Sequence, residues 1–521
     1  MKTLLLFVLL PLLIAQGPRG QRQGAPAANP ASEPARSGEA ARPNQETAKA
    51  LEEEAPVATK HEMRLNGAVL RYTATTGMMP IRSAQGQIEA NLFYVAYTLD
   101  GVSDVSKRPL MFAFNGGPGS ASVWLHMGCI GPKRVQLNAD GSLPAAPYQL
   151  ADNDQTWLDQ TDLVFVDPVG TGYSRAANAD LLKRFSGMQG DLQSVGEFVR
   201  LYLSRNSRWT SPLFLTGESY GTLRAASLAG HLLDDGIAFN GVVLLSTVLN
   251  FETIEFQHGN DLPYMLYLPT YTAAAFYHKK LAPDLQKNLE TTLKDSEKWA
   301  ESGYVEALAK GDRLSDAEYK ATAAKLAHYT GLDDGYVEDS DLRVNIAHFT
   351  RQLLRDRKLM AGRFDSRLTA AAPLDTSETP DFDPSLADVR APYTAMFNQY
   401  VRTELGYRND ATYYVLGGGI DRWDYGQQNQ NRYVDVSETL RDALAKNPHM
   451  KVFVGSGYFD LATPYFATQY TFSHLGLNPG LRKNVSMQYY MAGHMFYIDG
   501  ASRVKLRGDI AQFVKDAAPA N

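Results

Sequence analysis

Short apolar runs, each bounded by glycine, aspartate or proline, recur along most of this 521-residue chain. They lie at residues 110–114, 163–166, 213–215, 242–245 and 452–454. Runs that are apolar on both faces are typical of central strands covered on each side by helices. Because segments 194–204 and 220–233 have helical spacing, strands and helices alternate. The sequence therefore predicts an α/β fold with a mostly parallel central sheet.

Two stretches of alternating apolar and polar residues precede these runs. The first contains Leu70 and Tyr72, and the second extends from Ile88 to Tyr94. Alternation with a period of two is typical of half-buried strands. We expect antiparallel strands joined through Gly77 and Pro80.

The pattern changes between residues 250 and 419, where helical stretches such as 283–308 and 315–328 are rich in Lys, Glu, Ala and Leu. The run at 452–454 then restores the strand pattern. We therefore expect a mainly helical cap inserted into one α/β domain. The expected boundaries are 61–249 for the first part of the domain, 250–419 for the cap and 420–521 for the second part.

The N-terminal residues have the composition of a targeting segment. Met1 and Lys2 precede an apolar run from Leu4 to Ala15, which favours a signal peptide over residues 1–15. A membrane anchor is the alternative, but a spanning helix needs about 20 apolar residues. Residues 16–60 are rich in Ala, Pro, Gly, Gln, Glu and Arg, which predicts a disordered linker. We expect an exported protein, periplasmic or secreted, without stable membrane insertion after signal removal.

Charge and cysteine content exclude several classes of function. The formal net charge is −6, from 51 basic and 57 acidic side chains, whereas nucleic-acid binding favours a basic surface. We therefore expect no nucleic-acid partner. The single cysteine, Cys129, excludes a disulfide within the chain and a cysteine-rich zinc site. No metal or organic cofactor is expected.

The sequence Gly217-Glu218-Ser219-Tyr220-Gly221 closes an apolar strand and opens a helix. This is the context of a nucleophile elbow, in which a strained turn projects a serine hydroxyl and the glycines let neighbouring backbone pass closely. Ser219 is therefore the candidate nucleophile. A tight turn without catalytic function is the alternative.

A serine nucleophile needs a base and an acidic residue that orients the base. Asp460 follows the run at 452–454, and His494 follows the apolar stretch 485–490. The order Ser, Asp, His along the chain is that of α/β hydrolases. Taken singly, an aspartate in a turn or one of ten histidines is weak evidence, but together they make Asp460 and His494 the candidate acid and base.

A glycine-rich turn, Asn115-Gly116-Gly117-Pro118-Gly119-Ser120, follows the run at 110–114 directly. Such a turn exposes amides that can stabilise an oxyanion, and the elbow offers the amide of Tyr220 from the other side. A phosphate-binding loop is the rival interpretation, but no lysine stands at the Walker position.

At these residues the chain resembles the serine carboxypeptidase family of α/β hydrolases. The resemblance covers the chain from about residue 65 to its end and includes three further motifs, which are Gly131-Pro132, Asp167 to Ser174 and Asp460 to Pro464. It implies an α/β-hydrolase fold with Ser219, Asp460 and His494 as the triad. It also implies the amides of Gly117 and Tyr220 as the oxyanion hole and the release of residues from peptide C-termini. The absence of the family's disulfides is consistent with a bacterial, exported branch.

The resemblance further implies that a hydrogen-bond network holds the C-terminal carboxylate of the peptide. Asn115, Gly116 and Glu218 stand at positions of that network. Two carboxylates share a small site only when one is protonated, so we expect a protonated Glu218 and a preference for acidic pH. An exposed, purely structural Glu218 is the alternative.

The chain departs from the family at two positions of this network. Ala113 replaces a usual tryptophan, and Cys129 stands where a glutamate is common. Selectivity for C-terminal residues therefore needs a test. An esterase or acyltransferase with the same triad and a catalytically silent peptide-binding protein are the alternatives to a carboxypeptidase acting on peptides.

Overall fold

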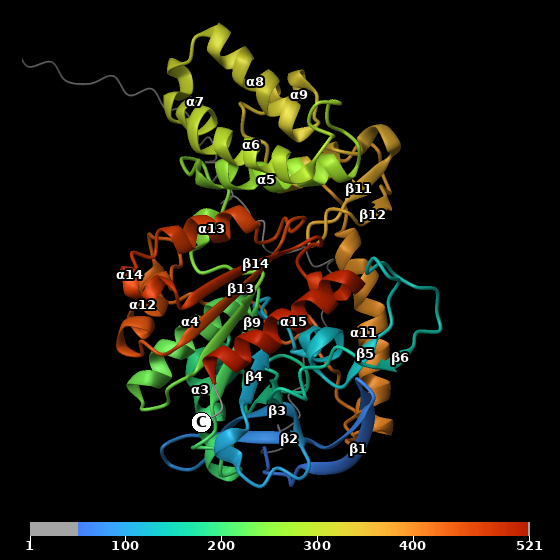
Figure 1. The fold of residues 1–521 in the computed structure, drawn as a ribbon, viewed down its shortest axis with the longest axis vertical. Coiled ribbons are helices and arrows are strands. Elements are labelled where there is room, and N and C mark those ends of the chain that lie inside the picture. Colours follow the sequence, from blue (N-terminus) through green and yellow to red (C-terminus); the bar gives the residue numbers. More distant parts are fainter. Residues whose placement is uncertain (1–50, 519–521) are drawn as a thin grey trace, which may run out of the picture. The chain divides into compact units, whose positions relative to one another are not determined.

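The computed structural model describes residues 51–518. Its central sheet has ten strands (Figure 1). Nine of them follow the order β1-β2-β3-β7-β4-β9-β10-β13-β14, and β8 pairs with β3. Strands β5 and β6 form a second, small sheet, and β11 and β12 form a third. The strands are β1 Val57–Leu65, β2 Ala68–Arg82, β3 Ile88–Leu99, β4 Leu110–Phe114, β5 Lys133–Val135, β6 Leu150–Asp152, β7 Asp162–Val166, β8 Arg175–Ala176, β9 Leu213–Glu218, β10 Gly241–Leu245, β11 Leu359–Ala361, β12 Thr369–Ala371, β13 Lys451–Gly457 and β14 Val485–Tyr490.

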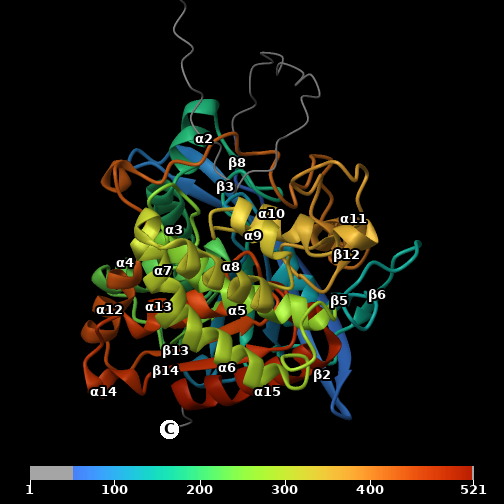
Figure 2. The same cartoon turned by 90° about the horizontal axis from the view of Figure 1, so that it is seen from above.

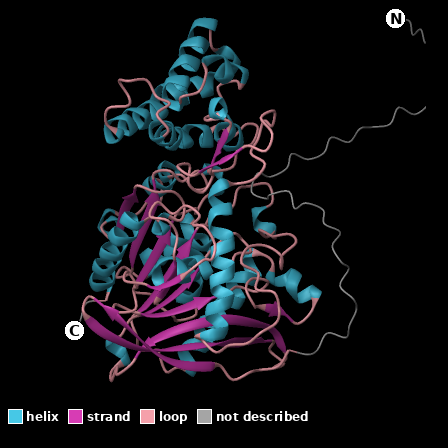
Figure 3. Ribbon diagram, turned by 90° about the vertical axis from the view of Figure 1, so that its right-hand side faces the viewer, coloured by secondary structure: helices cyan, strands magenta, loops and turns pink. Residues whose placement is uncertain are grey.

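Helices connect and cover these strands, as Figure 3 shows by colour. They are α1 Val123–Leu125, α2 Ala179–Phe185, α3 Met188–Arg205, α4 Tyr220–Asp234, α5 Leu262–Tyr277, α6 Leu289–Trp299, α7 Val305–Lys310, α8 Asp316–Thr330, α9 Asp334–Asp339, α10 Ile346–Gln352, α11 Pro384–Thr403, α12 Ser437–Lys446, α13 Tyr465–Ser473, α14 Pro479–Arg482 and α15 Gly500–Ala517.

The parallel part of the sheet runs from β7 to β14, and every apolar run that predicted a central strand lies in it. Both faces are buried. In β4, Met111 and Ala113 pack with α11 and α15 on one face, and Phe112 packs with α3 and α4 on the other. The predicted mostly parallel α/β sheet is therefore confirmed.

The prediction of a turn at Gly77 and Pro80 is wrong. Strand β2 continues through both residues, and the turn into β3 lies at residues 83–87. Strand β1 pairs with β2 only as far as Thr76, so Pro80 is bonded to a neighbour on one side only. On the open side its missing N–H breaks no ladder, which is why proline is tolerated there.

The insertion has its own hydrophobic core. Apolar side chains of α5 to α10 form it together with residues on and before α13, such as Phe459 and Tyr465. Helices α5 to α9 lie together on one side of the central sheet (Figures 1 and 2). The predicted cap segment also includes α11, but α11 packs its Tyr393 and Phe397 into the core beneath the sheet. Within 250–419, the buried residues of the cap core therefore come from the part before α11.

The predicted signal peptide lies outside the described residues, and so does most of the predicted linker. The linker prediction is wrong at its end, because β1 begins at Val57 and not after residue 60. The alternating burial of β1 against β2 explains this, since residues 57–65 gain a partner that composition alone does not show. None of the helices among residues 51–518 has the length and hydropathy needed to cross a membrane.

Candidate active site

Ser219 stands between β9 and α4 with φ 58° and ψ −130°. This conformation is unfavourable for a residue with a side chain, and the surrounding backbone has to hold it. The Ser219 amide donates to the carbonyl of Leu245 at 3.0 Å. A Cβ on Gly217 would lie 2.0 Å from the Gly221 carbonyl oxygen, so only glycine fits the turn. The segment has the geometry of a nucleophile elbow.

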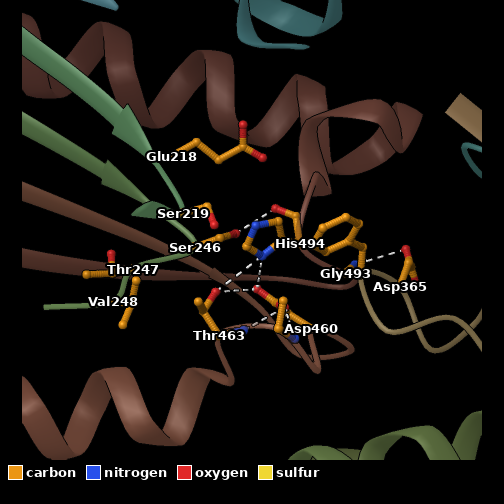
Figure 4. Close-up of polar contacts among 12 residues, drawn as sticks. Glu218, Ser219, Ser246, Thr247, Val248, Asp365, Asp460, Thr463, Gly493 and His494 are labelled. Atoms are coloured by element: carbon orange, nitrogen blue, oxygen red, sulfur yellow. Dashed lines mark hydrogen bonds and ion pairs between the residues drawn. The ribbon is translucent and has the colours of Figure 1, made fainter. Parts of the chain in front are cut away.

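Asp460 and His494, which are 34 residues apart in the chain, form a buried pair. His494 Nδ1 lies 2.8 Å from Asp460 Oδ2. An ionised carboxylate only accepts hydrogen bonds, so this contact assigns the proton to Nδ1 and leaves Nε2 as an acceptor. Figure 4 shows Ser219 on the side of the ring away from Asp460.

Local donors fix the carboxylate of Asp460. Its Oδ1 accepts from the amides of Ala462 at 2.7 Å and Thr463 at 3.0 Å, and its Oδ2 accepts from the Thr463 hydroxyl at 2.8 Å. These bonds form because the loop after β13 folds back on its own aspartate. The carboxylate therefore has one orientation, and the imidazole follows it.

Three residues that the sequence did not single out position His494. Its amide donates to the Phe364 carbonyl at 2.5 Å, and its carbonyl accepts from the Ser246 hydroxyl at 2.6 Å. The Phe364 ring stacks on the imidazole with centroids 4.8 Å apart. The neighbouring Asp365 accepts from the Gly493 amide at 3.0 Å (Figure 4). No pattern marks these residues, because each contact joins distant parts of the chain.

Within the described residues, no hydrogen bond joins the Ser219 hydroxyl to His494. Bonds of this kind are often long without substrate and shorten only in the complex. Burial lowers the pKa of His494, but the charge and hydrogen bond of Asp460 and the charge of Glu218 raise that pKa above its usual value overall. The imidazole is thus a stronger base than a free histidine.

The glycine turn after β4 lies against the elbow. A Cβ on Gly116 would be 2.4 Å from the Tyr220 amide nitrogen, and Gly117 has φ 102°. Tyr220 is the first residue of α4, so its amide has no carbonyl acceptor within the helix. The structure therefore brings Gly116, Gly117 and Tyr220 together beside Ser219.

Glu218 is buried and not exposed. Its Oε2 accepts from Tyr497 Oη at 2.8 Å and from Asn115 Nδ2, while Asn115 Oδ1 accepts from the Leu125 amide at 3.0 Å. Burial raises the pKa of Glu218 to about 7, against the opposing effects of His494, Tyr497 and Asn115. Tyr497 is a further residue that the sequence analysis missed, although it follows His494 by a few positions.

The two residues that depart from the family pattern, Ala113 and Cys129, are both buried. Ala113 lies in the sheet core, and burial and the charge of Glu218 raise the pKa of the Cys129 thiol well above its usual value. A thiol held in its neutral form is a poor nucleophile. Among residues 51–518 no cluster of His, Cys, Asp and Glu side chains has the arrangement of a metal site.

In sequence, this chain is similar to serine carboxypeptidases. The profile of the family described as serine carboxypeptidase matches residues 69–498. Pheromone-processing carboxypeptidase KEX1 of Saccharomyces cerevisiae is 31% identical over 155 residues, 28% of this chain and 20% of the yeast protein. Serine carboxypeptidase-like 11 of Arabidopsis thaliana is 25% identical over 220 residues, 38% of this chain and 48% of the plant protein. The matches thus span a fifth to a half of the length of these curated relatives.

The fold is also similar to a solved structure. KEX1(delta)P, a prohormone-processing carboxypeptidase from Saccharomyces cerevisiae, superimposes with a TM-score of 0.53 at 18% identity, covering 85% of this chain and 91% of that chain. At this identity the likeness concerns the fold alone. Together with the strand order, it confirms the predicted α/β-hydrolase fold.

Proposed function

Because the chain belongs to the serine carboxypeptidase family, we propose that it is a serine hydrolase that releases residues from the C-termini of peptides. The observation that carries the proposal is the arrangement around the elbow. A strained serine stands beside a buried Asp460–His494 pair on one side and a buried Glu218–Asn115 pair on the other. The first pair suits nucleophilic attack, and the second suits recognition of a carboxylate.

In the proposed reaction Ser219 Oγ attacks the carbonyl carbon of the last peptide bond and transfers its proton to His494 Nε2. The amides of Gly117 and Tyr220 donate to the oxyanion. Collapse breaks the C–N bond, His494 protonates the leaving amine, and the peptide remains as an ester on Ser219. Water, deprotonated by His494, then hydrolyses that ester and restores the serine hydroxyl.

Asn115, Gly116 and protonated Glu218 are proposed to hold the terminal carboxylate of the substrate. With its pKa near 7, Glu218 donates a proton to a hydrogen bond below that pH, whereas above it two negative charges oppose each other. Tyr497 and Asn115 occupy one oxygen of Glu218, which fixes the side chain while the acid donates.

The direct test compares peptides that differ only in a free or amidated C-terminus. We expect hydrolysis of the free acid to be faster by about tenfold to a hundredfold in kcat/KM, the worth of one charged hydrogen bond. Mass spectrometry of a mixed peptide library measures reaction and end-selectivity together. Equal rates on acid and amide would favour the esterase or acyltransferase alternative, and a protein that neither cleaves nor reacts with a fluorophosphonate would be a silent binder.

The pH dependence provides a second prediction. For free-acid peptides kcat/KM is expected to fall by about tenfold per pH unit above pH 7, as Glu218 loses its proton. Glu218→Gln stays neutral and donates at every pH, so that fall should disappear.

Glu255→Gln is the matched control, because burial also raises the pKa of Glu255 but its side chain is not part of the elbow network. Its pH profile should equal that of the wild type. A Glu218→Gln variant with the wild-type profile would contradict the proposed carboxylate site.

We further propose that the enzyme acts outside the cytoplasm, either periplasmic or secreted. The support is the charged start and apolar run of residues 1–15.

A further inference from the structure

A pocket of about 310 Å³ lies on the α15 side of the sheet, and Ser219 is not among the residues that line it. Its walls come from β5 and the loop that follows, from Tyr393 of α11 and from Gly500 and Arg503 at the start of α15. Arg134 of β5 lines it as well. Two arginines therefore line one small space.

Neither arginine has a carboxylate partner in the described part of the chain. Among the described residues no acidic oxygen lies within 4.0 Å of Arg134 or Arg503, whereas Arg507 on the same helix pairs with Asp159. The Nε atoms of both pocket arginines are buried without a hydrogen-bond partner, and Arg503 Nη1 reaches only the Tyr497 carbonyl, at 3.5 Å. Each of these buried N–H donors costs free energy as long as it has no acceptor.

The two charges also oppose each other. Burial lowers the pKa of Arg134, and the nearby charge of Arg503 lowers it further, against smaller effects of the exposed Asp154 and of Tyr393. Repulsion of this kind is relieved when an anion enters between the two groups. Guanidinium groups suit a carboxylate in particular, because their planar forks match its two oxygens.

The pocket adjoins the network around Glu218. A Cβ on Gly128, in the pocket wall, would lie 2.8 Å from Tyr393 Oη and 2.7 Å from Tyr497 Cε2. Tyr497 in turn donates to Glu218 at 2.8 Å. Gly128 of the pocket wall and Glu218 of the proposed substrate site thus lie against the same side chain, that of Tyr497.

We propose that this pocket is a carboxylate-binding site in which Arg134 and Arg503 hold the anion between them. The carboxylate can come from two sources, the acidic side chain of a residue at the substrate C-terminus or a free carboxylate in solution. Only the first source rests on the proposed carboxypeptidase function.

The first arm of the test measures binding without turnover. Isothermal titration of the full-length protein with succinate is expected to show saturable binding, and neutral succinamide should not bind. Arg134→Gln and Arg503→Gln should each weaken the binding of succinate at least about tenfold. Lys505→Gln on the same helix removes an equal charge from outside the pocket and should bind as the wild type does.

Folding is checked from the melting temperature of each variant, and Arg503→Lys, which keeps the charge but loses the fork, should bind with intermediate affinity. The binding of succinate and the binding of succinamide are compared in the wild-type protein. A variant that fails to fold therefore does not block the test. Equal binding of the two compounds, no binding of succinate, or undiminished binding in both folded glutamine variants would overturn the proposal.

The second arm separates the sources, using Ser219→Ala protein and peptides that end in glutamate or in glutamine. A preference for glutamate that disappears in Arg134→Gln and Arg503→Gln identifies the substrate side chain as the ligand. Succinate binding without such a preference identifies a free carboxylate, and both results support the pocket. Failure of the carboxypeptidase proposal would appear instead as absence of hydrolysis with succinate binding intact.

Discussion

Replacement of Ser219 by alanine is expected to lower kcat for peptide hydrolysis about a million-fold and to abolish labelling by a fluorophosphonate. The reason is that, within residues 51–518, the other hydroxyls bonded to His494 are those of Thr463 at Nδ1 and Ser246 at the carbonyl, and neither stands on the elbow. The remaining rate would come from oxyanion stabilisation and substrate binding alone. Intact-protein mass spectrometry gives the labelling, and a peptide assay at pH 6 gives kcat.

Ser227→Ala is the matched control, since Ser227 lies on the same helix α4 and its buried hydroxyl has no hydrogen-bond partner among the described residues. It should retain wild-type labelling and kcat. Because Ser219 has φ 58°, alanine keeps the strain and the melting temperature should change little. Labelling of Ser219→Ala at another serine would show that the elbow is not the nucleophilic site.

The central strands were predictable because burial on both faces leaves a local mark in the sequence. The run from Leu110 to Phe114 has no polar residue, and the strand has the same bounds. The first hairpin was not predictable in this way. Whether Pro80 ends a strand depends on how far β1 extends along β2, which is a property of pairing and not of the local sequence.

The site was predictable to the extent that its residues occur in motifs. The elbow glycines and the glycine turn are forced by close backbone contacts, so steric need and sequence pattern coincide at Gly116 and Gly217. The environment of His494 was not predictable from the sequence. The ring of Phe364 comes from the insertion, and the hydroxyl of Ser246 comes from the end of another strand.

The protonation of Glu218 was predictable from the sequence in part only. From the sequence alone, a protonated Glu218 is expected because a substrate carboxylate would place a second negative charge beside it. The structure adds a cause that acts without substrate, since burial already raises the pKa to about 7. Substrate would raise it further, because a second negative charge penalises ionisation again.

Asp460→Asn is expected to reduce kcat about ten-thousand-fold while leaving substrate binding nearly unchanged. The amides of Ala462 and Thr463 both donate to Oδ1, so an asparagine oxygen takes that place and its NH₂ group faces His494 Nδ1. The imidazole then accepts at Nδ1 and carries its proton on Nε2, where it can no longer remove the serine proton.

Thr463→Val is the graded control. It removes one donor to Asp460 but keeps the bond between Asp460 and His494, so kcat should fall by less than about tenfold. A shift of the imidazole nitrogen signals in NMR spectra of Asp460→Asn reports the change of tautomer directly. If Asp460→Asn lost no more activity than Thr463→Val, the aspartate would only support the loop after β13, and another group would have to orient the base.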